Sequence, residues 1–264
     1  MSSQLLSERR GSVLLLTINN PDARNALEPA IYQPGARAVR EAGEDEDIGA
    51  IVLTGDGGYF SSGGNLSLIA SLREGSRSAA EEGIAGLHDW ILALRTCPKP
   101  VIAAVEGTAA GAGFSLALAC DLLVAARETR FFAAHVKVGI SPDGGLTAAL
   151  SRALPPQMLA ELILEGKPVD AETLARFGIV NRLCSPGGAM AAALEWGERL
   201  AAGPRQAMSR IKQLLGAAYR NDLVAQLDLE QRLAVDGIFH DECGEGIAAF
   251  FEKRSPVFGA GGAQ

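Results

Sequence analysis

Short apolar runs alternate with amphipathic stretches along the first two thirds of the chain. The apolar runs are β-favouring and bounded by turn residues or prolines, which predicts strands over residues 13–18, 48–53, 101–105 and 122–126. Apolar residues at helical spacing predict helices over residues 26–42, 81–95 and 111–120. Pro34 and Gly35 should kink or shorten the first of these helices. This alternation of strand and helix favours a layered α/β core over a sandwich or a helical bundle.

The pattern becomes mainly helical after Pro155. Helical spacing continues to the end of the chain and predicts helices over residues 157–164, 171–177, 190–201, 204–219 and 222–251, with a brief strand over 179–184. We therefore expect a core over residues 1–188 and a helical region over residues 189–264. The glycine-rich end, residues 259–264, should be frayed.

Composition narrows the class of protein. A length of 264 residues with 48% hydrophobic and 21% charged residues fits one large globular domain. The net charge of −7 disfavours nucleic-acid binding, which usually needs an excess of Lys and Arg. The four cysteines form no C-x-x-C pair, so neither a zinc site nor a disulfide framework is indicated. No signal peptide or membrane span is evident, and we expect a cytoplasmic protein.

Two glycine-rich segments are candidates for chemistry. Residues 60–66 (FSSGGNL) follow a predicted strand and precede helical sequence, and residues 107–114 (GTAAGAGF) lead from a strand into an apolar helix. Small side chains let a ligand approach the backbone, and a helix N-terminus offers unpaired N–H groups. The alternatives are a plain turn and close packing of helix on strand. The spacing of the second segment does not fit the dinucleotide-binding fingerprint.

These segments and their order resemble the enoyl-CoA hydratase/isomerase, or crotonase, superfamily. The resemblance extends over nearly the whole chain through the motifs NPDARNAL (20–27), CDLLVA (120–125), GISPDGG (139–145) and FFEKRSPVF (250–258). It implies a spiral of β-β-α units with C-terminal helices that mediate assembly into a trimer or a dimer of trimers. It also implies an acyl-CoA substrate, no separate cofactor, and an oxyanion hole made by the N–H groups of Gly64 and Ala112.

The acidic residues distinguish reactions within this superfamily. Where a hydratase of the superfamily carries two glutamates, this sequence has Ser115 and His135. Asp143 stands where several isomerases carry a single acid, and one carboxylate can move a proton from C2 to C4 of the same dienolate. The alternative is that Asp143 caps a helix that begins at Gly144 and Gly145. His135 is a rival base, although its apolar neighbours favour a packed core histidine.

The resemblance also places substrate contacts on the glycine-rich loops. Arg24 lies in a motif whose loop contacts the nucleotide part of coenzyme A, and a guanidinium suits phosphate. The alternative is a solvated surface arginine. Lys253 and Arg254 are weaker candidates for phosphate contacts, and no metal site is predicted. The further substrate-binding candidates are Ala26, Ser62, Gly63, Asn65, Leu66, Gly111, Ser115 and His135.

We therefore expect an enzyme that binds an acyl-CoA, holds the thioester oxygen with the N–H groups of Gly64 and Ala112, and moves a proton with Asp143. The reaction that fits one carboxylate is isomerisation of a 3-enoyl-CoA to a 2-enoyl-CoA, or of a ring-type substrate. The alternatives are an enoyl-CoA hydratase or acyl-CoA hydrolase with unconventional acids, and a catalytically inactive CoA-binding protein. The sequence leaves the acyl chain length open.

Overall fold

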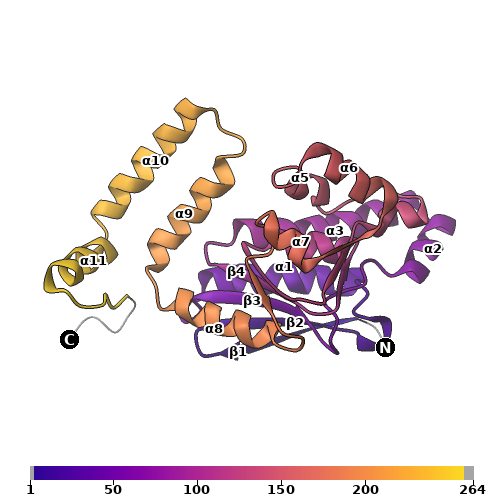
Figure 1. Cartoon of the computed structure of the whole chain (residues 1–264), viewed down its shortest axis with the longest axis horizontal. Coiled ribbons are helices and arrows are strands. Elements are labelled where there is room, and N and C mark those ends of the chain that lie inside the picture. The colour runs from indigo at the N-terminus through magenta and orange to yellow at the C-terminus, as the bar shows by residue number, and fades with distance from the viewer. Residues whose placement is uncertain (1–2, 259–264) are drawn as a thin grey trace.

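The computed structural model describes residues 3–258, which form a mixed α/β core with a lobe of helices at its C-terminal end (Figure 1). The larger sheet has the strand order β1-β2-β3-β4-β6-β9, with β1 antiparallel to β2 and the other neighbours parallel. Its strands are β1 (Gln4–Arg10), β2 (Val13–Asn19), β3 (Ala50–Gly55), β4 (Val101–Val105), β6 (Leu122–Ala126) and β9 (Arg182–Cys184). Every strand predicted from an apolar run is present.

Alternate side chains of the larger sheet enter two separate apolar cores. On β3, Ala50 and Val52 pack on one face, and Ile51 and Leu53 pack on the other. The helices α1 (Pro29–Glu44), α3 (Arg77–Thr96) and α4 (Ala112–Ala119) contribute to the core on the Ile51 face. The helix α8 (Ala189–Ala201) covers the opposite face. Burial on both faces explains why these strands are continuous apolar runs in the sequence.

A smaller sheet includes part of the second glycine-rich segment, residues 107–114. It has the order β5-β7-β8, formed by β5 (Thr108–Ala110), β7 (Arg130–Phe132) and β8 (Pro168–Asp170). The chain passes from β4 through β5 into α4, and from β6 through β7 towards further helices, which repeats the predicted β-β-α succession. The remaining core elements are α2 (Leu66–Glu74), α5 (Leu146–Leu150), α6 (Pro156–Glu165), α7 (Ala171–Arg176) and the 3₁₀ turns η1 (Pro21–Ala23) and η2 (Ala134–Val138).

The sequence predicts that Pro34 and Gly35 kink or shorten the helix α1. The helix continues through both residues, so the expected shortening is wrong. A Cβ atom at Gly35 would lie 2.3 Å from the Trp90 side chain. The glycine therefore lets α1 approach α3 closely. Packing of the two helices compensates for the backbone hydrogen bond that Pro34 cannot donate.

The helices α9 (Arg205–Ala217), α10 (Leu223–Ile238) and α11 (Asp241–Glu252) form the C-terminal lobe, which extends away from the sheets (Figure 1). The single helix predicted over 222–251 is two helices, because His240 caps the start of α11 by accepting the N–H of Glu242 at 3.2 Å. The first helix of the predicted C-terminal region, α8, packs on the core instead of joining the lobe. The predicted frayed end, residues 259–264, lies outside the described residues.

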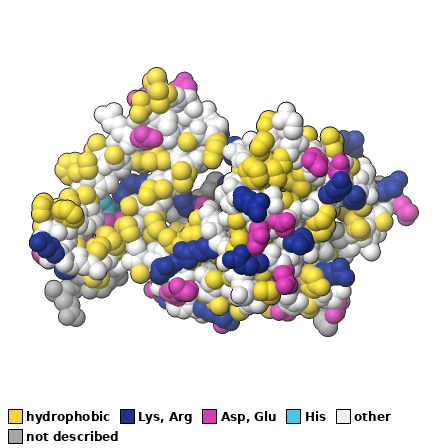
Figure 2. All heavy atoms as spheres, viewed as in Figure 1, with side chains coloured by type: hydrophobic (Ala, Val, Ile, Leu, Met, Phe, Trp, Pro, Cys, Tyr) yellow, Lys and Arg dark blue, Asp and Glu magenta, His cyan; other side chains and the backbone are white. Residues whose placement is uncertain are grey.

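Apolar side chains cover much of the C-terminal lobe. No described residue of α9 or α10 is buried. Four of the exposed side chains, with their exposed fractions, are Leu223 (73%), Phe239 (85%), Phe250 (78%) and Phe251 (77%). Figure 2 shows hydrophobic atoms spread over this part of the molecule. Exposed apolar surface of this extent is typical of a protein contact. None of the helices between residues 3 and 258 is long and apolar enough to cross a membrane.

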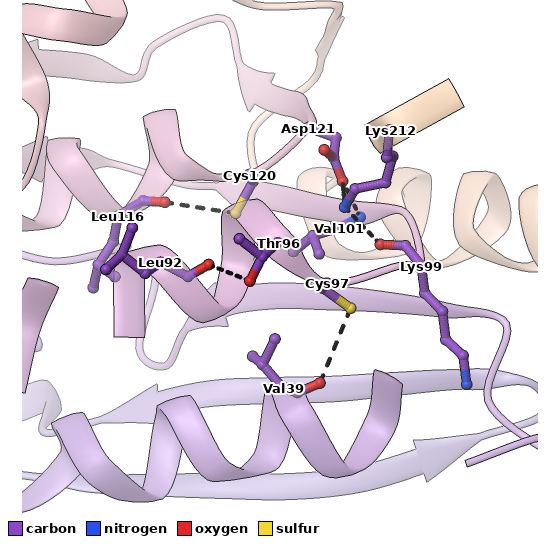
Figure 3. A network of polar contacts seen from close by, with 10 residues as sticks. All are labelled: Val39, Leu92, Thr96, Cys97, Lys99, Val101, Leu116, Cys120, Asp121 and Lys212. Carbon is purple, nitrogen blue, oxygen red and sulfur yellow. Dashed lines mark hydrogen bonds and ion pairs between the residues drawn. The ribbon is translucent and has the colours of Figure 1, made fainter. Parts of the chain in front are cut away.

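An ion pair fastens α9 to the larger sheet. The Lys212 ammonium contacts the Asp121 carboxylate and donates to the carbonyl of Lys99 at 2.7 Å (Figure 3). Asp121 also accepts the N–H of Val101 at 2.8 Å. The Lys212 side chain is only 10% exposed and that of Asp121 is 26% exposed. Withdrawal from water raises the pKa of Asp121 above its ordinary value of 3.8, while Lys212 and the Val101 N–H oppose that shift.

All four cysteines are free thiols. Cys97 and Cys120 are buried, and their thiols lie 4.0 Å from the carbonyl of Val39 and 3.6 Å from that of Leu116 (Figure 3). Burial raises the pKa of both thiols. They are therefore structural groups and not reactive thiolates.

Candidate active site

An apolar cavity of about 450 Å³ lies between α1, α2 and α3, the first residue of α4, and the loops that precede α2 and α5. Its volume is within the usual range of small-molecule sites. The apolar part of its wall includes Leu27, Leu68, Ile69, Leu72, Ile84 and Leu87. Gly64, Ala112 and Asp143 also line it. The three residues predicted as catalytic from the sequence therefore meet in one cavity.

The two glycine-rich segments lie side by side through backbone hydrogen bonds. The N–H of Ser61 donates to Thr108 at 3.0 Å, and the N–H of Ala110 donates back to Ser61 at 2.9 Å. Close packing accompanies this pairing, since a Cβ atom at Gly113 would lie 2.6 Å from that of Ser61. Glycine is needed here for packing, and the same close approach brings the two loops to one cavity.

The N–H groups of Gly64 and Ala112 have no acceptor within the described part of the chain. The amides that precede them, those of Gly63 and Gly111, donate within the protein at 3.1 and 2.9 Å. Ala112 is the first residue of α4, so its N–H lies at the positive end of the helix dipole. The two amides can therefore donate to an oxygen of a ligand in the cavity, which is the requirement of an oxyanion hole.

Asn25 is a buried residue that holds the loops together by hydrogen bonds, and it was not among the site residues predicted from the sequence. Its side chain is fully buried and accepts the N–H of Asn20 at 2.9 Å. Its amide nitrogen donates to the carbonyls of Asp56 and Tyr59, both at 2.7 Å. Its own carbonyl accepts the Ser61 hydroxyl at 2.7 Å. The signal in the sequence was an asparagine inside a cluster of turn residues, which also fits a solvent-exposed turn.

Asp143 and the residue after it are held by three neighbouring side chains. The carboxylate of Asp143, 29% exposed, lies 3.3 Å from the Nε2 atom of His135. Its backbone carbonyl accepts the hydroxyl of Ser115 at 2.9 Å. The N–H of the next residue, Gly144, donates to Nε2 of His88 at 3.3 Å. Ser115 and His135 stand at the two positions where a hydratase carries glutamates. Both of them contact Asp143.

The Asp143 side chain does not cap a helix. The helix α5 has Gly145 as its N-cap and no capping hydrogen bond from a side chain. Asp143 contributes only its backbone carbonyl, which accepts the N–H of Leu146 at 3.2 Å. The capping alternative is therefore excluded for the carboxylate. His135 is buried, as its apolar neighbours predict, and it directly contacts Asp143, the other candidate base.

Comparison with known proteins agrees with this geometry. The family description "Enoyl-CoA hydratase/isomerase" matches residues 8–261. The chain belongs to this family. It is 32% identical over 256 residues to the probable enoyl-CoA hydratase echA8 of Mycobacterium bovis, covering 96% of this chain and 97% of the relative. It is also 32% identical over 261 residues to the 2,3-dehydroadipyl-CoA hydratase of Escherichia coli, with coverage of 97% and 98%.

The fold of the family is present as well. The crystal structure of an enoyl-CoA hydratase from Polaromonas sp. JS666 matches with a TM-score of 0.94 at 44% identity, covering 96% of this chain and 98% of that chain. The expected crotonase-like α/β fold with C-terminal helices is therefore confirmed. The chain is an enzyme of the enoyl-CoA hydratase/isomerase family.

Tyr32 is a cavity residue of this family member that the sequence analysis missed. It lies on α1, lines the cavity and is 7% exposed. Burial, together with the carboxylates of Asp143 and Glu28, raises the pKa of Tyr32 to about 12. The phenol is therefore neutral at ordinary pH and can donate a hydrogen bond to a ligand. Its place on the apolar face of α1 made it indistinguishable from a core residue in the sequence.

Three residues predicted as substrate contacts do not line the cavity: Arg24, Ala26 and Ser62. Arg24 is exposed in a left-handed conformation, with its guanidinium 5.6 Å from the centre of the Tyr59 ring. Ser62 is exposed and donates its hydroxyl to the carbonyl of Ala23 at 3.1 Å. Ala26 is buried. Arg24 and Ser62 therefore form an exposed surface beside the loop of Gly64, suitable for the outer part of a long ligand.

The neighbouring loop of the enzyme contains Asn65 and Leu66. Asn65 lines the cavity and caps α2 by accepting the N–H of Ser67 at 2.9 Å. Its side-chain nitrogen donates to the carboxylate of Glu28, also at 2.9 Å. Leu66 is 58% exposed. Asn65 thereby fixes the start of α2 immediately after the Gly64 N–H, a structural role that the sequence analysis did not foresee.

The second proposed cation, Arg254, is already paired within the lobe. Its guanidinium contacts the carboxylates of Glu245 and Glu252, both at 2.6 Å. The Arg254 guanidinium and the N–H of Val257 lower the pKa of Glu245. A phosphate at Arg254 would have to compete with both carboxylates, which makes Arg24 the better candidate for a contact with the nucleotide.

Proposed function

We propose that this family member is an enoyl-CoA isomerase that converts a 3-enoyl-CoA, or a ring-type analogue, to the 2-enoyl isomer with Asp143 as its acid/base. One observation carries the proposal. Asp143 is the one carboxylate among the described residues that line the cavity shared by the Gly64 and Ala112 N–H groups. Ser115 and His135, at the positions of the hydratase acids, contact Asp143 instead of supplying a second carboxylate.

The proposed reaction is a proton transfer within one bound substrate. The thioester oxygen accepts hydrogen bonds from the N–H groups of Gly64 and Ala112, which stabilise the negative charge of the enolate. Removing one such donor typically raises the barrier by about 2.7–4 kcal/mol. The Asp143 carboxylate takes a proton from C2, and the electron pair of that bond spreads over a dienolate. Asp143 then returns the proton to C4, which restores the thioester carbonyl and moves the double bond from C3–C4 to C2–C3.

The cavity and its surroundings divide the substrate into two parts. The apolar walls contributed by α1, α2 and α3 suit the hydrocarbon of the acyl group. The phosphates of coenzyme A would lie on the exposed surface at Arg24, whose guanidinium is suited to them. Coenzyme A is thus part of the substrate in this proposal, and no separate cofactor takes part.

The assembly proposed for the enzyme is a homotrimer or a dimer of trimers. The support is the apolar surface of α9, α10 and α11, which a single chain leaves exposed. A closed ring of identical chains can cover such a surface on every copy. The contact between chains would also cover the lobe helices, which within one chain pack mainly against one another and, through α9, against α3.

A hydratase is the main rival, because the relatives named above carry hydratase names. A hydratase that lacks both glutamates would need another group to activate water. The proposed test incubates the purified protein separately with 3-hexenoyl-CoA and crotonyl-CoA and analyses the products by absorbance and mass spectrometry. We expect a conjugated 2-enoyl product of unchanged mass from 3-hexenoyl-CoA.

Three other outcomes would overturn the proposal. Rapid addition of water to crotonyl-CoA without isomerisation would indicate a hydratase. Release of free coenzyme A would indicate a hydrolase. Binding of the thioester without exchange of its C2 protons in deuterated water would indicate an inactive CoA-binding protein.

A further inference from the structure

His135 occupies an enclosed position beside the proposed base. It lies in η2, is 6% exposed, and has its Nε2 atom 3.3 Å from Oδ1 of Asp143. A Cβ atom at Gly111 would lie 3.8 Å from the same Nε2 atom. The imidazole therefore packs between the Asp143 carboxylate and the backbone that leads to the Ala112 N–H.

The other ring nitrogen has no partner. Nδ1 of His135 is buried and makes no hydrogen bond within residues 3–258. A neutral imidazole carries one N–H, which can be on either nitrogen. On Nδ1 it would be a buried donor without an acceptor, and the lone pair of Nε2 would face the carboxylate. On Nε2 it donates to Asp143 and leaves only an unpaired acceptor, which is the less costly arrangement.

We propose that His135 is a positioning residue that donates its Nε2–H to Oδ1 of Asp143 and directs Oδ2 towards the C2 proton of the substrate. This inference rests on the proposed isomerase function. The hydrogen bond makes the two carboxylate oxygens inequivalent, because Oδ1 is occupied and Oδ2 is left for the substrate. It also holds the carboxylate in one orientation between the removal of the proton at C2 and its return at C4.

The role explains why a histidine stands where a hydratase carries its second acid. An imidazole that is buried and donates its Nε2–H to Asp143 is not free to activate a water molecule. Ser115 acts on the backbone of the same residue by donating to the Asp143 carbonyl at 2.9 Å. The two positions that carry glutamates in a hydratase thus both serve to hold one aspartate here.

Two substitutions separate positioning from packing. His135→Leu fills a similar volume but removes the donor, whereas His135→Gln keeps an N–H donor at about the reach of Nε2. Because displacement of a catalytic group by about 1 Å can reduce the rate about 100-fold, we expect His135→Leu to lower kcat about 10- to 100-fold. KM should change by less than about threefold, because the lost interaction acts on the reacting proton and not on uniform binding.

The glutamine variant provides the rescue, and His240→Gln provides a matched histidine control on the lobe. We expect His135→Gln to retain kcat within about fivefold of the wild-type value, and His240→Gln to leave it unchanged. A wild-type kcat in His135→Leu would overturn the inference. So would an equal loss in the leucine and glutamine variants. Failure of the proposed function is distinguishable, because the wild type would then not isomerise 3-hexenoyl-CoA, or Asp143→Asn would remain active.

A measurement on the unaltered protein keeps the inference testable if the variants do not fold. The chain has three histidines, so ¹⁵N-histidine labelling gives a spectrum that can be assigned with single substitutions. The ¹⁵N shifts of an imidazole distinguish its two neutral tautomers. We expect the Nε2–H tautomer for His135. A neutral ring with its proton on Nδ1 would overturn the inference.

Discussion

At the residue scale, the proposed oxyanion site consists of backbone groups. Glycines stand beside it at positions where a side chain would collide with the neighbouring loop. Gly63 has a φ of +91°, and a Cβ atom there would lie 2.6 Å from the carbonyl oxygen of Ala110. Gly113 is needed for the approach of Ser61. Any side chain at these positions would move the two loops apart, and with them the N–H groups of Gly64 and Ala112.

Arg24 tests the outer part of the substrate site. We expect Arg24→Ala to raise KM about tenfold while kcat stays nearly constant, because a phosphate contact stabilises the ground state and the transition state equally. Steady-state kinetics with 3-hexenoyl-CoA measures both values. Arg37→Ala is the control, since Arg37 is exposed and its one ion pair within residues 3–258 is a 3.9 Å contact with Glu41. A collapsed kcat with an unchanged KM would contradict the assignment.

The residues of the candidate site were predictable to different degrees. Gly64, Ala112 and Asp143 belong to local motifs, so their neighbours in sequence pointed to them. Tyr32 and Asn25 did not stand out, because their importance depends on partners far away in the chain. Asn25 acts through Asp56, Tyr59 and Ser61, and these contacts exist only in the fold.

At the element scale, the same distinction between local and distant information applies. The strands β3 and β4 are buried on both faces and appear in the sequence as apolar runs. The strands β5 and β7 have three residues each, too few for a periodic pattern, and β1 is an edge strand with mostly exposed side chains. Helix boundaries were missed where a capping contact decides them, as at His240 between α10 and α11.

Lys212 tests how α9 is fastened to the core. Lys212→Met removes the cation that opposes the unfavourable partial burial of Asp121. The substitution should lower the free energy of unfolding by about 1–3 kcal/mol at neutral pH, a deficit between the values for exposed and buried ion pairs. Without the Lys212 cation, the pKa of Asp121 in the folded chain should rise further above 3.8, while its pKa in the unfolded chain stays the same. The deficit should therefore be small below pH 3.8 and grow as the pH rises.

Denaturant unfolding at several pH values, at one protein concentration, measures this deficit. Lys167→Met is the control, because the ion pair of Lys167 with Glu165 is exposed. That variant should change the unfolding free energy by no more than about 1 kcal/mol. A Lys212→Met deficit that shrinks as the pH rises would contradict the account.

At the scale of the whole molecule, the C-terminal lobe predicts assembly. We expect a solution mass of three or six times the 27.5 kDa of one chain, because association covers the apolar surface of α9 to α11. Light scattering coupled to size exclusion gives this mass directly. Replacing the exposed Leu223 and Phe250 by aspartate should shift the protein towards smaller species. A monomeric wild type at micromolar concentration would contradict the proposed assembly.

The central claim of the account is that Asp143 carries the proton in an isomerase. Asp143→Asn keeps the shape of the side chain but cannot accept the C2 proton. Since α5 has no side-chain cap, the substitution should leave stability nearly unchanged. Loss of a general base typically costs about 10²- to 10⁴-fold in rate. The decisive measurement is the kcat of Asp143→Asn on 3-hexenoyl-CoA, with substrate binding measured in parallel. We predict a loss of that size with binding retained, and a kcat equal to the wild-type value would contradict the account.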